Sequence, residues 1–408
     1  MNAVANFLSN TKAGVKLLLQ RMSRRAPGPV RVVFICQYIP AWNKAKPVYD
    51  QMVNDPRFEP YLLCLPSGIS DMQLQDPKSL ANDTYDYYTS QGYPAINALI
   101  GENQWFDLQS LQPDYVFYLR PYDFYMPVQY GSATVSRYAK VCVIIYGIIT
   151  TLEDAKMMIL PGFFRNVTYY FADISDGARF NRRLFPISHL LGLRKSPCCG
   201  IPAMDSILAT QNDPADIWDF AGDRFRILWT PRWTTDKTLG GSNFFTYKDW
   251  IMDYAKANDD VACLLRPHPL AFDNFVRTGE MTPQEVTDYK NQCAATTNTN
   301  LDTQKEYGAT FWQSDVLIGD FSGILPEYFI TGKPLIFCRS NFELTPTDFM
   351  KQMMEGWYIV DNARELEEVL DRLRRGDDPL RPVREATIKA LFYSSTASPT
   401  EKILKHLK

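Results

Sequence analysis

Residues 314–338 read SDVLIGDFSGILPEYFITGKPLIFC and contain the pattern that decides the fold. Asp315-Val-Leu-Ile318 and Pro334-Leu-Ile-Phe-Cys338 are apolar runs bordered by polar residues or proline, which is typical of strands buried on both faces. A short helix is predicted between them, beginning at Ser322-Gly323 and with Pro326 in its first turn. Strands joined in this way predict a parallel sheet covered by helices.

The same kind of strand recurs throughout the chain. Further strands are predicted over residues 31–36, 60–65, 114–118, 141–145, 225–229 and 261–265, and helices over 44–54, 246–258, 363–374 and from Ser398-Pro399 onward. We therefore expect an α/β protein with two Rossmann-like domains and parallel sheets. The expected segments are a basic N-terminal stretch (1–28), a first domain (29–198), a second domain (199–380) and C-terminal helices (381–408).

Composition excludes several classes of protein. The 408 residues carry a formal charge of −3, which argues against a nucleic-acid partner. The eight cysteines show no C-x-x-C spacing and several lie in apolar runs, which predicts free thiols in a cytoplasmic protein. The three histidines include no pair at metal-ligand spacing, so no metal site is expected. No apolar run is long enough to span a bilayer.

The N-terminal segment has a charge pattern of its own. Residues 1–25 contain Lys12, Lys16, Arg21, Arg24 and Arg25 and no acidic residue, and apolar side chains recur among them near helical spacing. A basic amphipathic helix on an anionic membrane surface has this pattern, and so does a helix whose apolar stripe packs on its own protein. The first interpretation predicts a peripheral protein at the inner face of the plasma membrane.

Two motifs directly follow predicted strands, where parallel sheets bind ligands. Arg266-Pro267-His268-Pro269 offers one permanent and one titratable cation in a loop made rigid by proline, which suits binding of a diphosphate. The alternative is a histidine that merely hydrogen-bonds the backbone. In the second motif, Asp320 precedes Ser322-Gly323 at a predicted helix start, where N–H groups attract anions, and Glu327 lies one turn further on. The alternative there is an ordinary helix cap.

Other candidates follow the remaining strands. Thr230-Pro231-Arg232 ends the strand at 225–229, where Arg232 faces either a phosphate or a surface partner. In the first domain, Tyr146-Gly147 follows the strand at 141–145, and Arg120-Pro121-Tyr122-Asp123 follows the strand at 114–118. Both loops are candidates to line a ligand site.

The second half of the chain resembles the CDP-glycerol glycerophosphotransferase family of teichoic-acid and capsule synthesis. The resemblance rests on Ile227-Leu-Trp-Thr-Pro231, Leu265-Arg-Pro-His-Pro269, the run from Ser314 to Cys338, and Cys199-Gly-Ile-Pro-Ala-Met-Asp205. It extends over about residues 199–340. It implies a GT-B fold, with two Rossmann-like domains facing a cleft and the nucleotide in the second domain.

The resemblance also implies an activity, namely transfer of glycerol phosphate or ribitol phosphate from a CDP-alditol to a hydroxyl of a lipid-linked glycan, releasing CMP without an obligatory cofactor. By position, His268 and Arg266 engage the diphosphate, Ser322 and Gly323 cradle phosphate, and Glu327 holds the ribose. Tyr146-Gly147 stands where many members have His-Gly, and a neutral tyrosine is a poor base near pH 7. Residues 320–323 read DFSG, whereas D-Y-S-S is commoner in the family, so one hydroxyl group is missing at the implied phosphate cradle.

Two other functions stay open from the sequence. One is a GT-B glycosyltransferase that uses a nucleotide-sugar with the same phosphate-binding loops. The other is a non-catalytic nucleotide-binding scaffold of an envelope-assembly complex, which the missing histidine favours.

Overall fold

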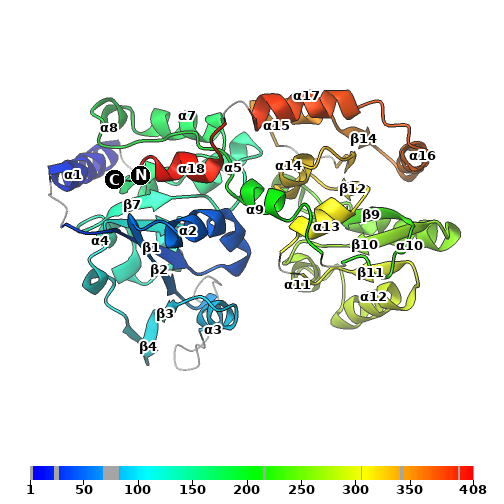
Figure 1. Cartoon of the computed structure of the whole chain (residues 1–408), viewed down its shortest axis with the longest axis horizontal. Helices are drawn as coiled ribbons and strands as arrows, with labels where there is room; N and C mark the ends of the chain where they lie inside the picture. Colours follow the sequence, from blue (N-terminus) through cyan, green and yellow to red (C-terminus); the bar gives the residue numbers. More distant parts are fainter. Residues whose placement is uncertain are drawn as a thin grey trace. The chain divides into compact units, whose positions relative to one another are not determined.

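Two parallel six-stranded sheets organise the chain in the computed structural model (Figure 1). The structure describes residues 3–22, 27–67, 82–214, 217–304, 306–340, 344–393 and 396–407. The first unit comprises Met1–Ile149, Asp154–Asp205 and Ala397–Lys408, and the second comprises Thr150–Glu153 and Ser206–Thr396. The C-terminal residues, which the sequence analysis groups together, are thus divided between the two units.

The first unit contains one of these sheets, with every neighbouring pair parallel. Its strand order is β3 (Ala95–Asn97), β2 (Phe58–Cys64), β1 (Val30–Cys36), β6 (Tyr115–Tyr118), β7 (Lys140–Val143) and β8 (Val167–Tyr170). A small antiparallel pair is formed by β4 (Leu99–Gly101) and β5 (Gln104–Trp105). The helices are α1 (Ala3–Met22), α2 (Lys46–Val53), α3 (Asp83–Ser90), α4 (Ser132–Val135), α6 (Pro161–Phe164), α7 (Ser175–Leu184), α8 (Pro186–Leu190) and α18 (Pro399–Leu404), with 3₁₀ helices η1 (Ile39–Lys44), η4 (Leu108–Leu111), η5 (Asp123–Tyr125) and η6 (Val128–Tyr130).

The second unit contains the other sheet, again with parallel pairs throughout. Its strand order is β11 (Thr299–Leu301), β10 (Val261–Leu265), β9 (Phe225–Thr230), β12 (Val316–Gly319), β13 (Leu335–Cys338) and β14 (Tyr358–Val360). The helices are α10 (Phe244–Ala257), α11 (Ala271–Arg277), α12 (Pro283–Ala295), α13 (Gly308–Gln313), α14 (Ile324–Phe329), α15 (Asp348–Met354), α16 (Ala363–Arg374) and α17 (Arg381–Leu391), with the 3₁₀ helix η7 (Lys237–Leu239). The chain passes between the units after Ile149, within α5 (Leu152–Met158), within α9 (Ala203–Ala209) and after Thr396.

Both sheets have the same topology. When the six strands of each sheet are numbered in chain order, both sheets have the order 3-2-1-4-5-6, which is the Rossmann order. The order reverses between β1 and β6 in the first sheet and between β9 and β12 in the second. The predicted pair of Rossmann-like sheets is therefore confirmed, and these two reversal points are where such sheets bind ligands.

The central strands form at the apolar runs of the sequence. Residues on both faces of these strands are buried, so each run is apolar throughout. Phe34 of β1 stacks on Phe117 of β6, with ring centroids 4.9 Å apart, and both are fully buried. The capping box at Ser398 and Glu401 begins α18 as predicted. This last helix belongs to the first unit, where Ile403 packs in the core and α18 contacts α2 (Figure 1).

Helix α1 packs on the first unit by one face and exposes apolar residues on another. Ala13 and Leu17 are buried, and the Gln20 amide donates to the carbonyl oxygens of Ser136 at 2.6 Å and Ala139 at 2.7 Å. Its exposed large hydrophobic residues are Val15, Leu18 and Leu19. Arg24 and Arg25 and the side chains of residues 3–8 and 21–22 lie outside what the structure describes.

Candidate active site

The loops that the sequence analysis singled out in the second half lie together at one edge of the second sheet. Thr230-Pro231-Arg232 leaves β9, Arg266 to His268 leave β10, and Asp320 to Gly323 leave β12. These three strands are neighbours, and the reversal of strand order lies between β9 and β12. The structure thus places the candidate residues of this half at the carboxyl edge of the sheet, where doubly wound sheets bind ligands.

Asp320 holds two of these loops in place. It is buried, and its carboxylate accepts hydrogen bonds from the Arg232 N–H at 2.8 Å, the Asn243 N–H at 3.1 Å and the Ser242 hydroxyl at 3.0 Å. Burial raises the pKa of Asp320, and these hydrogen bonds oppose the increase. The carboxylate therefore fixes the backbone of Arg232 relative to β12.

The Arg232 guanidinium is fixed in turn by its surroundings. It donates a hydrogen bond to the Phe321 carbonyl oxygen, and the backbone of Gly240 passes directly over it. A Cβ atom on Gly240 would lie 2.8 Å from the Arg232 Cζ, and the φ of Gly240 is +105°, a conformation that glycine adopts without strain. Only glycine gives Arg232 this space.

His268 is a neutral hydrogen-bond donor in this arrangement. Its Nδ1 accepts from the Leu270 N–H at 3.2 Å, which assigns the ring proton to Nε2. Burial, with the nearby charge of Arg232, lowers the pKa of His268 to about 4. The backbone N–H of His268 donates to the Pro231 carbonyl oxygen at 3.1 Å, so the β9 and β10 loops are joined at this point.

Thr230 and Pro231 shape the loop. The Thr230 hydroxyl is buried and donates to the Ile318 carbonyl of β12 at 3.2 Å. A Cβ atom on Gly319 would lie 2.7 Å from that hydroxyl oxygen, so β9 and β12 approach closely here. Thr230 and Pro231 connect the end of β9 to Arg232 and so position Arg232 at the edge of the sheet.

Arg266 is engaged by protein groups that the sequence analysis missed. Its guanidinium pairs with the fully buried carboxylate of Asp302 at 2.6 Å and donates to the Gln304 carbonyl at 2.9 Å. Its Cζ also lies 4.9 Å from the centroid of the Tyr307 ring. The Tyr307 hydroxyl donates to Glu327, which is buried on α14. Arg266 and Glu327 are therefore linked through one tyrosine.

The Ser322-Gly323 turn leads into a helix that begins slightly later than predicted. The first residue of α14 is Ile324, with Gly323 at the capping position and no side-chain cap. Ser322 and Gly323 are half-buried at the carboxyl edge. Ser322 has a small side chain and Gly323 has none, as is usual where a backbone is approached closely.

Tyr146 belongs to the first unit, where it follows β7. Its hydroxyl lies 3.2 Å from that of Tyr122. Burial raises its pKa, so the side chain is neutral and suited to hydrogen bonding.

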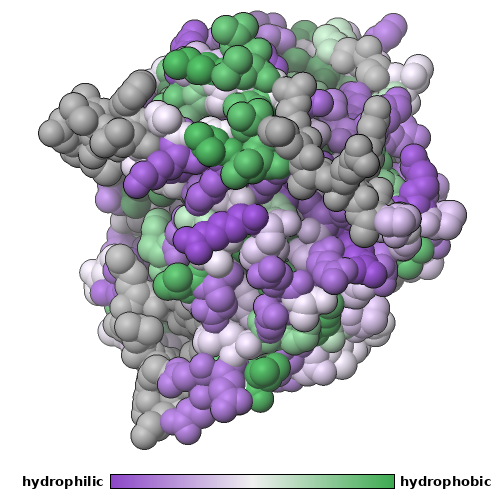
Figure 2. All heavy atoms as spheres, turned by 90° about the vertical axis from the view of Figure 1, so that its left-hand side faces the viewer, coloured by the Kyte–Doolittle hydropathy of each residue, from purple (hydrophilic) through white to green (hydrophobic). Residues whose placement is uncertain are grey.

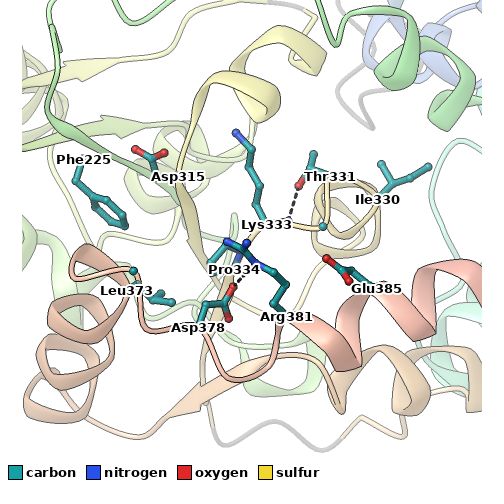
Figure 3. Close-up of a pocket in the computed structure, with 12 residues that line it drawn as sticks. Phe225, Asp315, Ile330, Thr331, Lys333, Pro334, Leu373, Asp378, Arg381 and Glu385 are labelled. Atoms are coloured by element: carbon teal, nitrogen blue, oxygen red, sulfur yellow. Dashed lines mark hydrogen bonds and ion pairs between the residues drawn. The ribbon is translucent and has the colours of Figure 1, made fainter.

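A pocket of about 510 Å³ lies at the opposite edge of the second sheet (Figure 3). Its lining includes Phe225, Asp315 and Pro334, which stand at the amino-terminal ends of β9, β12 and β13. The Lys333 Nζ donates a hydrogen bond to the Ser314 carbonyl oxygen at 2.5 Å. This pocket lies at the amino-terminal edge of the sheet and is therefore separate from the candidate site, which lies at the carboxyl edge where such sheets bind ligands.

The two Rossmann-type sheets, one in each unit, have the architecture of a GT-B enzyme. The chain belongs to the family described as CDP-Glycerol:Poly(glycerophosphate) glycerophosphotransferase, whose pattern matches residues 175–403. It is thus a CDP-glycerol glycerophosphotransferase, as the sequence resemblance implied.

Solved structures show the same fold at low identity. The wall teichoic acid polymerase TagF matches with a TM-score of 0.55 at 14% identity, covering 100% of this chain and 98% of that one. UDP-GlcNAc 2-epimerase from Neisseria meningitidis, bound to UDP-GlcNAc, matches with a TM-score of 0.58 at 13% identity, covering 93% of this chain and 99% of that one. No curated protein matches the chain.

Proposed function

We propose that the protein transfers glycerol phosphate from CDP-glycerol to a hydroxyl group of a lipid-linked glycan and releases CMP. The observation that carries the proposal is the family match over residues 175–403, which includes every loop at the carboxyl edge of the second sheet. A TagF structure obtained with CDPG has the same fold, with a TM-score of 0.53 at 13% identity. Ribitol phosphate remains the alternative group.

The edge of the second sheet offers the donor diphosphate a matched set of groups. Arg232 supplies positive charge, and the Nε2–H of His268 supplies a directed hydrogen bond. The half-buried turn at Ser322-Gly323 provides a place for phosphate oxygens. Glu327, oriented by Tyr307, is assigned to the ribose hydroxyls. Arg266 acts through Tyr307 and Asp302 rather than on the diphosphate directly.

The chemical step exchanges one phosphorus–oxygen bond for another. The acceptor oxygen bonds to the phosphorus that carries glycerol, the bond from this phosphorus to the bridging oxygen breaks, and CMP leaves with that oxygen and the electron pair. Phosphoryl transfer through a loose transition state requires mainly positioning and charge stabilisation. The hydroxyl proton leaves the acceptor oxygen as the new bond forms and is released to solvent. Tyr146 is not assigned as its base, because burial raises the Tyr146 pKa and keeps the side chain protonated.

The proposal is tested by mixing the purified protein with CDP-glycerol and a lipid-linked acceptor and following the nucleotide released. We expect CMP and glycerol phosphate transfer, and a higher melting temperature with CMP or CDP-glycerol than with UDP or nucleotide-sugars. CDP-ribitol as the better donor would change the transferred group. Turnover of a nucleotide-sugar would make the protein a glycosyltransferase, and binding without turnover would make it a scaffold.

We also propose that the first unit binds an anionic membrane surface through α1 and α8. Val15, Leu18 and Leu19 of α1 and Ile187, Leu190 and Leu191 in and after α8 are exposed, beside basic residues that include Lys12. Figure 2 shows hydrophobic atoms gathered on this face of the molecule. No helix among the described residues is long and apolar enough to cross a membrane. Burial of such side chains at a bilayer surface, with basic neighbours, supports peripheral binding.

Replacing both Leu18 and Leu19 with aspartate is expected to weaken binding to vesicles containing phosphatidylglycerol by at least about tenfold, because two exposed leucines leave the interface and two negative charges are added. A sedimentation assay measures the bound fraction, and CMP binding should not change. Ala13 and Leu17 stay in place, so the helix remains packed. Val53→Asp, at an exposed position on α2, is the control. Equal vesicle binding by the double variant and the wild type would contradict the proposal.

A further inference from the structure

The switch point of the first sheet carries a group of aromatic side chains around one arginine. Tyr38 follows β1, Arg120, Tyr122 and Tyr125 follow β6, and Tyr146 follows β7. We call these five residues the Arg120 cluster. The strand order reverses between β1 and β6, so the cluster occupies in this sheet the place that the candidate donor site occupies in the other.

Arg120 is held in this cluster by rings alone. Its Cζ lies 5.2 Å from the ring centroid of Tyr38 and 4.3 Å from that of Tyr125. The side chain is half-buried, and no hydrogen bond or ion pair within the described ranges engages its guanidinium. The nearby Asp123 carboxylate instead accepts from the N–H and hydroxyl of Ser132, at 2.7 and 2.8 Å. A positioned guanidinium therefore keeps its donors available for an anion.

Polar groups with unused hydrogen-bonding capacity surround the arginine. The hydroxyls of Tyr122 and Tyr146 lie 3.2 Å apart, and burial raises the pKa of both side chains, which keeps them protonated. The Gln37 amide donates to the Tyr125 carbonyl at 2.6 Å. The Gln37 side-chain oxygen is buried and has no hydrogen-bond partner among the residues described. A buried acceptor of this kind calls for a donor such as a ligand hydroxyl.

We propose that the Arg120 cluster binds a phosphate ester that carries free hydroxyl groups. A guanidinium grips phosphate by two parallel hydrogen bonds, and the hydroxyl pair and the Gln37 oxygen suit the polyol part. Phe124, which is 63% exposed and packs against Tyr125, offers an apolar face beside it. Identification of this ligand with the glycerol phosphate end of the acceptor rests on the proposed transferase function, whereas the binding of the ester does not.

Binding is measured by calorimetry with sn-glycerol 3-phosphate as the probe, on the full chain saturated with CMP. Arg120→Gln is expected to weaken binding of the probe by about tenfold or more, as for the loss of a charged hydrogen bond. Arg120→Lys, which keeps the charge without the fork, should give an intermediate loss. Arg57→Gln removes the same charge from an exposed position of the same unit and should have no effect. Melting temperatures verify that each variant is folded.

Two outcomes would overturn the proposal. One is wild-type protein that does not bind the probe, and the other is Arg120→Gln protein that binds it as tightly as the wild type. The second outcome would place the probe in the other unit, where His268→Ala should then reduce its affinity. Gln37→Leu, which removes the buried acceptor but not the charge, should weaken glycerol 3-phosphate more than inorganic phosphate.

Kinetics distinguish this inference from the proposed function. In the transfer assay, Arg120→Gln is expected to raise the KM for the acceptor about tenfold while the KM for CDP-glycerol stays unchanged. Probe binding that depends on Arg120 in a protein without transfer activity would refute the function and leave the site standing. Transfer with an acceptor KM indifferent to Arg120 would refute the acceptor assignment and leave the function standing.

Discussion

Replacing His268 with alanine is expected to lower kcat for glycerol phosphate transfer by about 10²–10³-fold, the usual effect of removing one directed donor from a developing charge. The reason lies in the fixed Nε2–H, which Leu270 defines by occupying Nδ1. The loss should fall on kcat more than on CMP affinity, because the donor acts where negative charge grows on the leaving phosphate. Single-turnover measurement of CMP release and calorimetry with CMP separate the two quantities.

The pH dependence gives a second test of the same assignment. Because burial and Arg232 lower the pKa of His268 to about 4, the free enzyme holds a neutral imidazole at all pH values well above 4. The profile of kcat/KM should therefore show no step from His268 near pH 6.5, and protonation should matter only as the pH falls toward 4. A step near pH 6.5 that disappears in His268→Ala would contradict the neutral donor.

Two further variants serve as references for His268→Ala. His268→Gln can still offer an N–H and should recover part of the rate. His406→Ala changes a histidine that lies two residues after α18 in the first unit, where its ring packs near Tyr169 and Phe171. This variant should leave the turnover per folded molecule unchanged. A rate in His268→Ala equal to that of His406→Ala would remove His268 from the chemistry.

The sequence predicts the architecture well because the strands of both sheets are buried on both faces. Runs such as Val261–Leu265 have no polar position and are strands by composition alone. The edge strands are different. For example, β11 has only three residues, TNL, and lacks the apolar run from which a strand could be predicted. It matters for function because Asp302, the partner of Arg266, comes directly after it.

The loops of the site were predictable by position, and their internal contacts were not. A motif after a strand marks the ligand edge, which is why Arg232, His268 and Ser322 are found together. Whether an arginine faces a ligand or a carboxylate depends on residues that are distant in the sequence. Arg266 and Asp302 are such a pair, and the link from Tyr307 to Glu327 is another. The same applies to α18, whose capping box predicts a helix but not the unit on which it packs.

Arg266→Ala is expected to reduce the free energy of unfolding by about 3 kcal/mol, the cost of leaving a buried charge without its partner. The Asp302 side chain is fully buried, and the arginine is only 13% exposed, so little solvent reaches the pair. The loss should also release Tyr307, which lies under the guanidinium and orients Glu327. Urea unfolding measures the change, with Arg364→Ala, an exposed arginine on α16, as the control.

The double variant Arg266→Ala with Asp302→Asn decides what the arginine does. In the wild type the Gln304 N–H donates to the Asp302 carboxylate at 2.9 Å. An asparagine at position 302 can still accept this hydrogen bond, but it carries no charge that must be buried. If Arg266 serves mainly to neutralise Asp302, the double variant should recover a large part of the lost stability, as expected for coupled residues. Its CMP affinity should then approach that of the wild type. If the double variant recovers stability but binds CMP more weakly than the wild type, Arg266 contacts the nucleotide itself. An unchanged unfolding midpoint in Arg266→Ala would show that the ion pair is not stabilising.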